Sequence, residues 1–167
     1  GITTIGNYSF TDCSSISSLS FPSTLTSINS YAFSGCSGIK NINNWGSVER
    51  IGEYAFKSIN VETLRLSENI TSIGKDAFSE ITTLKTVSYD GLKNPTIENV
   101  FTNSKVTEVS VKIGYENDKF CELIPKTSEE CGEEEGNCVY EYNHNSKILT
   151  FTEKRIGAPI KEITSSN

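Results

Sequence analysis

The chain has 167 residues, of which 21 are acidic and 15 are basic, and its formal net charge is −6. The basic residues are scattered singly along the sequence, so we expect no patch that neutralises phosphates and no nucleic acid partner. No apolar run approaches the ~20 residues of a membrane-spanning helix, so we also expect no direct membrane insertion.

One phrase recurs from the start of the chain. Its clearest copy is Ile51-Gly52-Glu53-Tyr54-Ala55-Phe56, and related copies stand at residues 5–10, 28–33 and 73–78. A phenylalanine recurs every 22 or 23 residues, at Phe10, Phe33, Phe56, Phe78 and Phe101. A fixed period of this size is typical of a solenoid and lies in the roughly 20–29-residue range of leucine-rich repeats. We therefore predict five repeats over residues 1–111, with these phenylalanines stacked in a structural ladder.

A second apolar run begins about six residues after each phenylalanine. Its copies with the spacing L-x-x-L-x-L are Ile16, Leu19, Phe21; Val61, Leu64, Leu66; Leu84, Val87, Tyr89; and Val106, Val109, Val111. The alternation of the last two positions predicts a short parallel β-sheet on one face of the solenoid, with irregular or short helical or 3-10 connections. In the second repeat Asn44 takes the third apolar position, and we expect a bulge there that lets Trp45 cover the gap.

Three further repeat positions carry expectations of their own. Gly6, Gly52 and Gly74 are expected to permit a tight bend after the repeat isoleucine. The tyrosines at 8, 31 and 54 form either a partly buried row that closes the corner of each coil or a stripe on which a ligand stacks. The equivalent cysteines at 13 and 36 are either small buried thiols or, if the coil spacing suits, a disulfide.

The period stops after Val111. We predict a cap over the last coil at residues 112–131, because an open solenoid end leaves apolar surface and strand edges uncovered. Residues 132–167 read as a Cys/Gly-led segment with a β-hairpin, whose strands are expected at 139–142 and 148–152. Cys131 and Cys138 are a possible disulfide in an oxidising compartment. We predict no metal site there, since Cys121, Cys131, Cys138 and His144 lack the close cysteine pairs of structural zinc.

The units at residues 25–39 and 70–78 resemble the BspA-like, or Treponema pallidum-type, leucine-rich repeats, and the resemblance covers about residues 1–111. The stretch from 131 to 152 is also similar to the cysteine-glycine hairpin segment that precedes repeat blocks in such proteins, which implies the start of a following block. The resemblance implies a surface-exposed or secreted protein that adheres to host cells or matrix proteins. The family shares no catalytic residues, so none is assigned, and no cofactor is expected.

The residues between the ladder positions of each strand project away from the core, and they are the candidate partner-binding surface. The candidates are Lys40, Asn41, Asn43, Glu62, Arg65, Lys85, Ser88 and Glu108. A merely solvated face is the alternative interpretation. Two sequons, at Asn7 and Asn69, are possible glycosylation sites in a secreted eukaryotic protein, although chance occurrence also explains them in a chain this rich in Ser, Thr and Asn.

The repeat pattern together with the family resemblance implies two candidate functions. The first is a non-catalytic module that binds a protein or glycoprotein of a host surface or matrix. The second is a structural spacer, or a scaffold that associates with itself while another region binds. An enzyme is not predicted, because His144 lies in an expected hairpin turn without a nucleophile or positioning partner nearby in the sequence.

Overall fold

The computed structural model describes residues 1–97, 99–112 and 115–116, and also the backbone of the strands at 126–127, 138–143, 148–153 and 163–164. The chain divides into two compact units, Gly1–Thr127 and Ser128–Asn167. The predicted domain bounds at residues 111 and 131 stay predictions, and most of the predicted cap lies outside the described residues.

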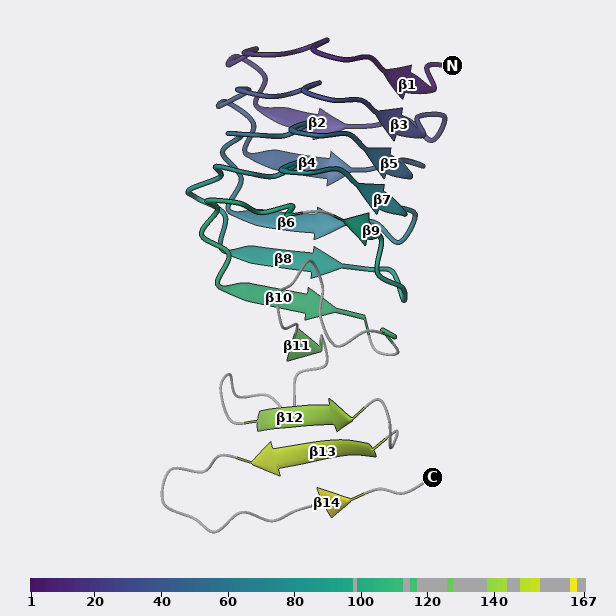
Figure 1. Ribbon diagram of the computed structural model, residues 1–167, viewed down its shortest axis with the longest axis vertical. Helices are drawn as coiled ribbons and strands as arrows, with labels where there is room; N and C mark the ends of the chain where they lie inside the picture. The colour runs from purple at the N-terminus through teal and green to yellow at the C-terminus, as the bar shows by residue number, and fades with distance from the viewer. Residues whose placement is uncertain are drawn as a thin grey trace. The chain divides into compact units, whose positions relative to one another are not determined.

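The first unit is the predicted parallel-strand solenoid, and we number its coils 1 to 5 by their phenylalanines, Phe10 to Phe101 (Figure 1). The L-x-L runs of the coils lie in or beside the strands of one column. Within each of its two sheets, neighbouring strands pair in parallel with partners about one period apart, as in Leu64 with Val87 and Val87 with Val109. These strands are β2 (Ser18–Ser20), β4 (Asn41–Asn44), β6 (Thr63–Leu66), β8 (Thr86–Tyr89) and β10 (Glu108–Val111). The short β11 (Lys126–Thr127) pairs in parallel with β10.

A second column of strands runs beside the first, and the sequence analysis did not predict it (Figure 1). It is built from the residue pair that ends in the repeat isoleucine, in the order β1 (Thr4–Ile5), β3 (Ser27–Ile28), β5 (Arg50–Ile51), β7 (Ser72–Ile73) and β9 (Thr96–Ile97). Two residues are too short to show the alternation from which strands are recognised in a sequence. Their pairing depends on the stacking of whole coils.

The core consists of ladders of equivalent side chains. Phe33 stacks on Phe56 with ring centroids 5.3 Å apart, and Phe56 on Phe78 at 5.2 Å. The repeat isoleucines at 28, 51 and 73 are buried as well, and so are the inward-facing strand residues of coils 3 and 4, Leu64, Leu66, Val87 and Tyr89. Each coil therefore covers the apolar face of its neighbour, as the period predicted.

The left-handed backbone of the turn that contains the ladder phenylalanine does not fall on the expected glycines, Gly6, Gly52 and Gly74. Two residues of each such turn are left-handed. The one two positions before the phenylalanine has φ between 41° and 59° in Tyr8, Tyr31, Tyr54, Asp76 and Asn99, and the one two positions after the phenylalanine also has a positive φ. Gly52 and Gly74 lie elsewhere, where an added Cβ would come within 2.5 and 2.6 Å of a backbone nitrogen of the preceding coil. These two glycines thus permit close contact between coils rather than a bend.

The connections between strands are turns and bends, and neither α- nor 3-10 helix occurs among the described residues. Of the predicted connection types, the irregular one is therefore found. No described segment provides a helix that could cross a bilayer.

The second unit contains the predicted hairpin. β12 (Cys138–Asn143) and β13 (Ile148–Glu153) pair antiparallel, and β14 (Ile163–Thr164) adds a third antiparallel strand against β13. Cys131 and His144 lie outside the described residues, so the possible disulfide with Cys138 stays a prediction.

Candidate interaction surface

The outward face of the β2–β10 column carries the candidate binding residues. Lys40, Asn41 and Asn43 lie on or just before β4, and all three are exposed. On or just before the strands that follow, Glu62, Arg65, Lys85 and Glu108 are also exposed, and Ser88 is half-buried. The alternation of exposed and buried residues along β6 matches the predicted division into core and outer face.

The column is interrupted between coils 2 and 3. β2 and β4 form a sheet of their own, separate from the sheet of β6, β8, β10 and β11. The register between β2 and β4 shifts, because Ser20 pairs with Asn44 and leaves Asn43 as the extra residue. The bulge predicted for the second repeat is therefore confirmed.

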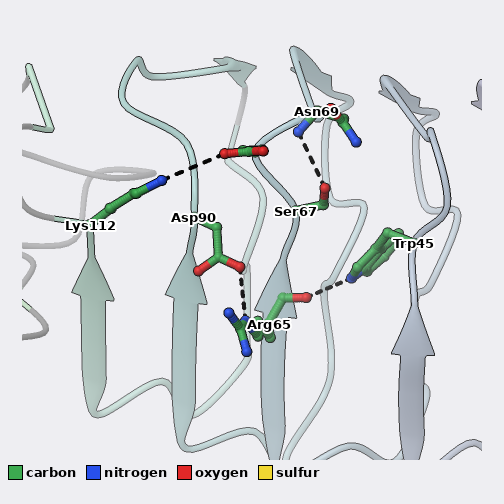
Figure 2. Close-up of polar contacts among 7 residues, drawn as sticks. Trp45, Arg65, Ser67, Asn69, Asp90 and Lys112 are labelled. Atoms are coloured by element: carbon green, nitrogen blue, oxygen red, sulfur yellow. Dashed lines mark hydrogen bonds and ion pairs between the residues drawn. The ribbon is translucent and has the colours of Figure 1, made fainter.

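Trp45 fills the gap at the end of this bulged strand. Its indole is buried and lies 5.8 Å from the ring of Phe21 and 5.6 Å from that of Phe56. Its N–H donates to the backbone carbonyl of Arg65 at 2.5 Å, across the interruption (Figure 2). A side-chain hydrogen bond thus joins the two sheets at this point.

Four charged side chains in the C-terminal half of the face form two ion pairs, whereas Glu108 forms none among the described residues. The Arg65 Nε donates to Asp90 at 2.8 Å, and the Lys85 ammonium lies 3.2 Å from Glu62 (Figure 2 shows the first pair). Hydrogen bonding to the Asp90 carboxylate raises the pKa of Arg65 above its usual value. Exposed pairs of this kind contribute only about 0–1 kcal/mol each to stability. They do reduce the charge that this half of the face offers to a partner.

The N-terminal half of the face is different. Among the residues that the structure describes, Lys40 takes part in no ion pair, and its neighbours Asn41 and Asn43 expose uncharged amides. Asn44 is exposed too, but its amide oxygen accepts from the backbone N–H of Gly46. The surface of β2 and β4 is thus neutral and polar apart from one uncompensated lysine.

The sequence analysis treated Glu62, Arg65 and Lys85 as separate candidates, so it missed their ion pairs and did not name Asp90. Glu62 and Lys85 are 23 residues apart, so the repeat period could have revealed this pair. Asp90 lies 25 residues after Arg65, and Lys112 pairs with Glu68 from two coils away at 3.7 Å (Figure 2). Diagonal contacts of this kind do not follow from the period.

The tyrosine row lies on the turn side of the solenoid. Tyr8 stacks on Tyr31 at 4.8 Å and Tyr31 on Tyr54 at 4.9 Å, with ring planes within 18°. The faces of Tyr31 are therefore covered by its two neighbours. This packing agrees with the interpretation as a row that closes the coil corners, because it leaves neither ring face of Tyr31 open to solvent.

The cysteines at 13 and 36 are free, and Cys36 is buried. The Cys36 thiol donates to the carbonyl of Phe10 in the preceding coil at 2.8 Å. Burial, the largest influence, raises the pKa of this thiol. Ser104, at the equivalent position of coil 5, donates to the carbonyl of Phe78 in the same way at 2.8 Å. The thiol of Cys36 thus serves as a hydrogen-bonding link between coils.

The two sequon asparagines are both exposed. The Asn7 amide oxygen accepts from the backbone N–H of Ser30 at 3.1 Å, and the amide nitrogen of Asn69, in the turn after β6, donates to the carbonyl of Gly46 at 3.4 Å. Figure 2 shows the Asn69 backbone N–H donating to the Ser67 hydroxyl. Glycosylation of either residue stays a prediction. In the described part of the chain, no three His, Cys, Asp or Glu residues are grouped to hold a metal ion.

Comparisons with known proteins complete this description. A leucine-rich repeat protein from Bacteroides ovatus is a solved structure similar to this chain, with a TM-score of 0.42 and 21% sequence identity; the match covers 66% of this chain and 37% of that one. A search of curated proteins gives no match. The family described as BspA type Leucine rich repeat region matches residues 3–120 with 6 copies, where the spacing of phenylalanines indicated five. Because this match spans well over half of the sequence, the chain belongs to the BspA-type leucine-rich repeat family.

Proposed function

We propose that the chain is a non-catalytic protein-binding module of a cell-surface or secreted, adhesin-like protein. Its partner is a protein or glycoprotein of a host surface or extracellular matrix, bound through the outward face of the β2–β10 column. The family supports a protein-interaction scaffold, since solenoids bind partners along such extended faces. The adhesive role and the extracellular location are more specific than the scaffold role, and they belong to our proposal.

One observation supports this surface most directly. On β4 the uncompensated Lys40 stands beside the exposed amides of Asn41 and Asn43, next to the interruption of the sheet. None of these groups takes part in an ion pair among the described residues, so a partner can bind them without first breaking an ion pair. The binding centre proposed here is therefore the β2–β4 half of the face, with Arg65 and Lys85 at its margin.

The test is binding of the chain to a panel of immobilised extracellular-matrix proteins. We expect Lys40→Glu combined with Asn41→Ala and Asn43→Ala to weaken binding by at least about tenfold, or ~1.4 kcal/mol. The matched control is Lys75→Glu, which changes an exposed lysine of the turn side by the same charge. Equal weakening by the control would show non-specific electrostatic binding and reject the proposed face.

The spacer function remains the alternative, and the mutual neutralisation of Glu62 with Lys85 and of Arg65 with Asp90 favours it. A face that satisfies its own charges has less to offer a partner. If the chain binds none of the panel while a longer segment of the same protein binds through another region, the spacer function holds instead.

A further inference from the structure

The junction between coils 2 and 3 is interrupted on one side only. In the outer column β4 and β6 belong to different sheets, whereas β6, β8 and β10 form one continuous sheet (Figure 1). The second column continues through the junction, because β3 pairs with β5 and places Ile28 opposite Ile51. The phenylalanine ladder continues too, with Phe33 on Phe56 at 5.3 Å. Strand pairing therefore joins these two coils along the second column and is absent along the outer one.

Ion pairs connect the coils on the C-terminal side of this junction. The pairs between coils are Arg65 with Asp90, Lys85 with Glu62, Lys57 with Glu80 and Lys112 with Glu68. All of them lie within coils 3 to 5, and among the described residues no ion pair joins coil 2 to coil 3. Each exposed pair contributes only about 0–1 kcal/mol, but all of them resist separation of the same three coils. Coils 3 to 5 are thus connected more closely to one another than to coil 2.

On the interrupted side, the side chain of Trp45 closes the junction. This residue belongs to coil 2, but its indole lies 5.6 Å from the ring of Phe56 in coil 3 and 6.4 Å from that of Phe78 in coil 4. Its N–H donates to the carbonyl of Arg65 (Figure 2). Contacts that a paired strand spreads over several residues are here concentrated in one side chain.

From this asymmetry we infer that the junction between coils 2 and 3 is a hinge. The continuous column of β3, β5 and β7 is its axis, and its opening separates β4 from β6 while the other strand pairs stay closed. Opening breaks the bond from Trp45 to Arg65 and withdraws the indole from Phe56. A hinge needs only a few residues that absorb a change in backbone angle, and the bulge at Asn43 supplies such a place.

The hinge divides the outward face into two parts. Lys40, Asn41 and Asn43 move with coils 1 and 2, whereas Arg65 and Lys85 move with coils 3 to 5. A partner that contacts both parts therefore selects one hinge angle, and a partner that contacts only one part does not. The hinge is a property of the chain itself and does not depend on the proposed function.

Hydrogen exchange of single amides, measured by NMR, tests the hinge. The Asn60 N–H donates across the interrupted side of the junction to the carbonyl of Ile39, and the Lys85 N–H donates from coil 4 to the carbonyl of Glu62, both at 2.9 Å. The two bonds are equal in length, so geometry alone predicts similar protection. After correction for intrinsic rates, we expect the Asn60 amide to exchange at least about tenfold faster than that of Lys85.

The turn side of the same junction supplies the matched control. The Phe33 N–H donates to the carbonyl of Ala55 at this junction, and the Phe56 N–H to that of Ala77 at the next, both at 2.8 Å. These two amides should exchange at rates within about threefold of each other. Equal exchange of Asn60 and Lys85 would overturn the inference. So would exchange of Phe33 as fast as that of Asn60, because the coils would then separate on both sides.

Trp45→Phe tests the closing contact. The variant lacks the donor to Arg65, so the exchange rate of Asn60 should rise about threefold or more relative to that of Lys85. A loss of stability of the whole array accelerates both amides, so their ratio isolates the hinge. Arg65→Ala is the control, because it keeps the carbonyl and should change the ratio by less than about twofold. A ratio that Trp45→Phe leaves unchanged would show that no hinge is closed by this residue.

Discussion

The indole N–H of Trp45 donates to the backbone carbonyl of Arg65 at the place where the outer sheet is interrupted. The bulge in β4 turns this side chain into the core, where it lies against Phe21 and Phe56. One residue therefore occupies the space of the missing strand position and satisfies a carbonyl of the next coil. The stability of the junction between coils 2 and 3 should depend on it.

Trp45→Phe tests this relationship. The variant retains an aromatic ring but removes the donor, so we expect a loss of about 1–2 kcal/mol in the free energy of unfolding. Urea denaturation measures this loss. It is followed by circular dichroism rather than by tryptophan fluorescence, because Trp45 is the single tryptophan and the variant replaces it. Arg65→Ala is the control, since it keeps the carbonyl and removes only an exposed side chain, and its cost should stay below about 1 kcal/mol. A smaller cost for Trp45→Phe than for Arg65→Ala would contradict this account.

The phenylalanine ladder should be most sensitive in its middle. Phe56 is fully buried between the rings of Phe33 and Phe78, so Phe56→Ala should cost about 3–5 kcal/mol. Phe10 has a ring on one side only and is partly exposed, so Phe10→Ala should cost about half as much. Thermal unfolding of the two variants gives the comparison, and equal costs would mean that ring stacking does not set the stability of the array.

Close contact between coils makes Gly52→Ala costly. The new Cβ would lie 2.5 Å from the backbone nitrogen of Ser30, so the two coils must separate locally, and we expect a loss of about 1–3 kcal/mol. Asn29 stands at the equivalent place in coil 2, so the first junction does accept a side chain and the array should still fold. Gly6→Ala is the matched control, because it meets only the Ser9 hydroxyl at 3.3 Å, and it should be neutral or slightly stabilising. A Gly52→Ala variant as stable as Gly6→Ala would show that the spacing is not fixed by this contact.

The link between Cys36 and the Phe10 carbonyl can be tested with serine. Ser104 makes the same bond three coils further along the array, so Cys36→Ser should keep the interaction. Cys36→Ala leaves the link unmade and should be about 1 kcal/mol less stable than Cys36→Ser in chemical denaturation. If alanine is as stable as serine, the thiol acts only as a small apolar group.

Alkaline pH should weaken the fold through two groups. Burial raises the pKa of the Cys36 thiol, and a hydrogen bond to Asp76 raises the pKa of the Tyr54 hydroxyl. Each group is then held protonated in the folded chain more strongly than in the unfolded chain. Their contribution is complete at neutral pH and decreases above about pH 8.5 for the thiol and about pH 10 for the phenol, the usual pKa values.

Asp76→Asn separates the second of these effects. Asparagine suits the left-handed backbone at this position, as Asn99 shows in coil 5, so the turn should be retained. Ultraviolet titration of tyrosinate should show the ionisation of one tyrosine moving to lower pH. In a Tyr54→Phe background the same substitution should change nothing, and a shift that persists there would assign the effect to another tyrosine.

The period of the phenylalanines and the L-x-L runs predicted the solenoid, the parallel outer strands and the buried ladders. These features follow from the sequence because each depends on a residue type that recurs at a fixed spacing. The bulge at Asn43 was also predictable, since a polar residue at a ladder position and a large apolar residue just after it can both be accommodated only by a shift. The hairpin strands were recognised from two β-rich runs around a polar turn.

Other features depend on distances between coils that no single repeat encodes. The two-residue strands of the second sheet become strands only when five coils align, and the left-handed tyrosines look like any aromatic row in the sequence. The diagonal pairing of Arg65 with Asp90 likewise could be recognised only in the packed structure. The same is true of Lys40 near the interruption, which takes part in no ion pair among the described residues. The sequence by itself thus determined the repeat, its core and its family, because apolar periodicity is local information. Only the tertiary structure decided which surface groups are satisfied and which remain available, because that depends on contacts between different coils.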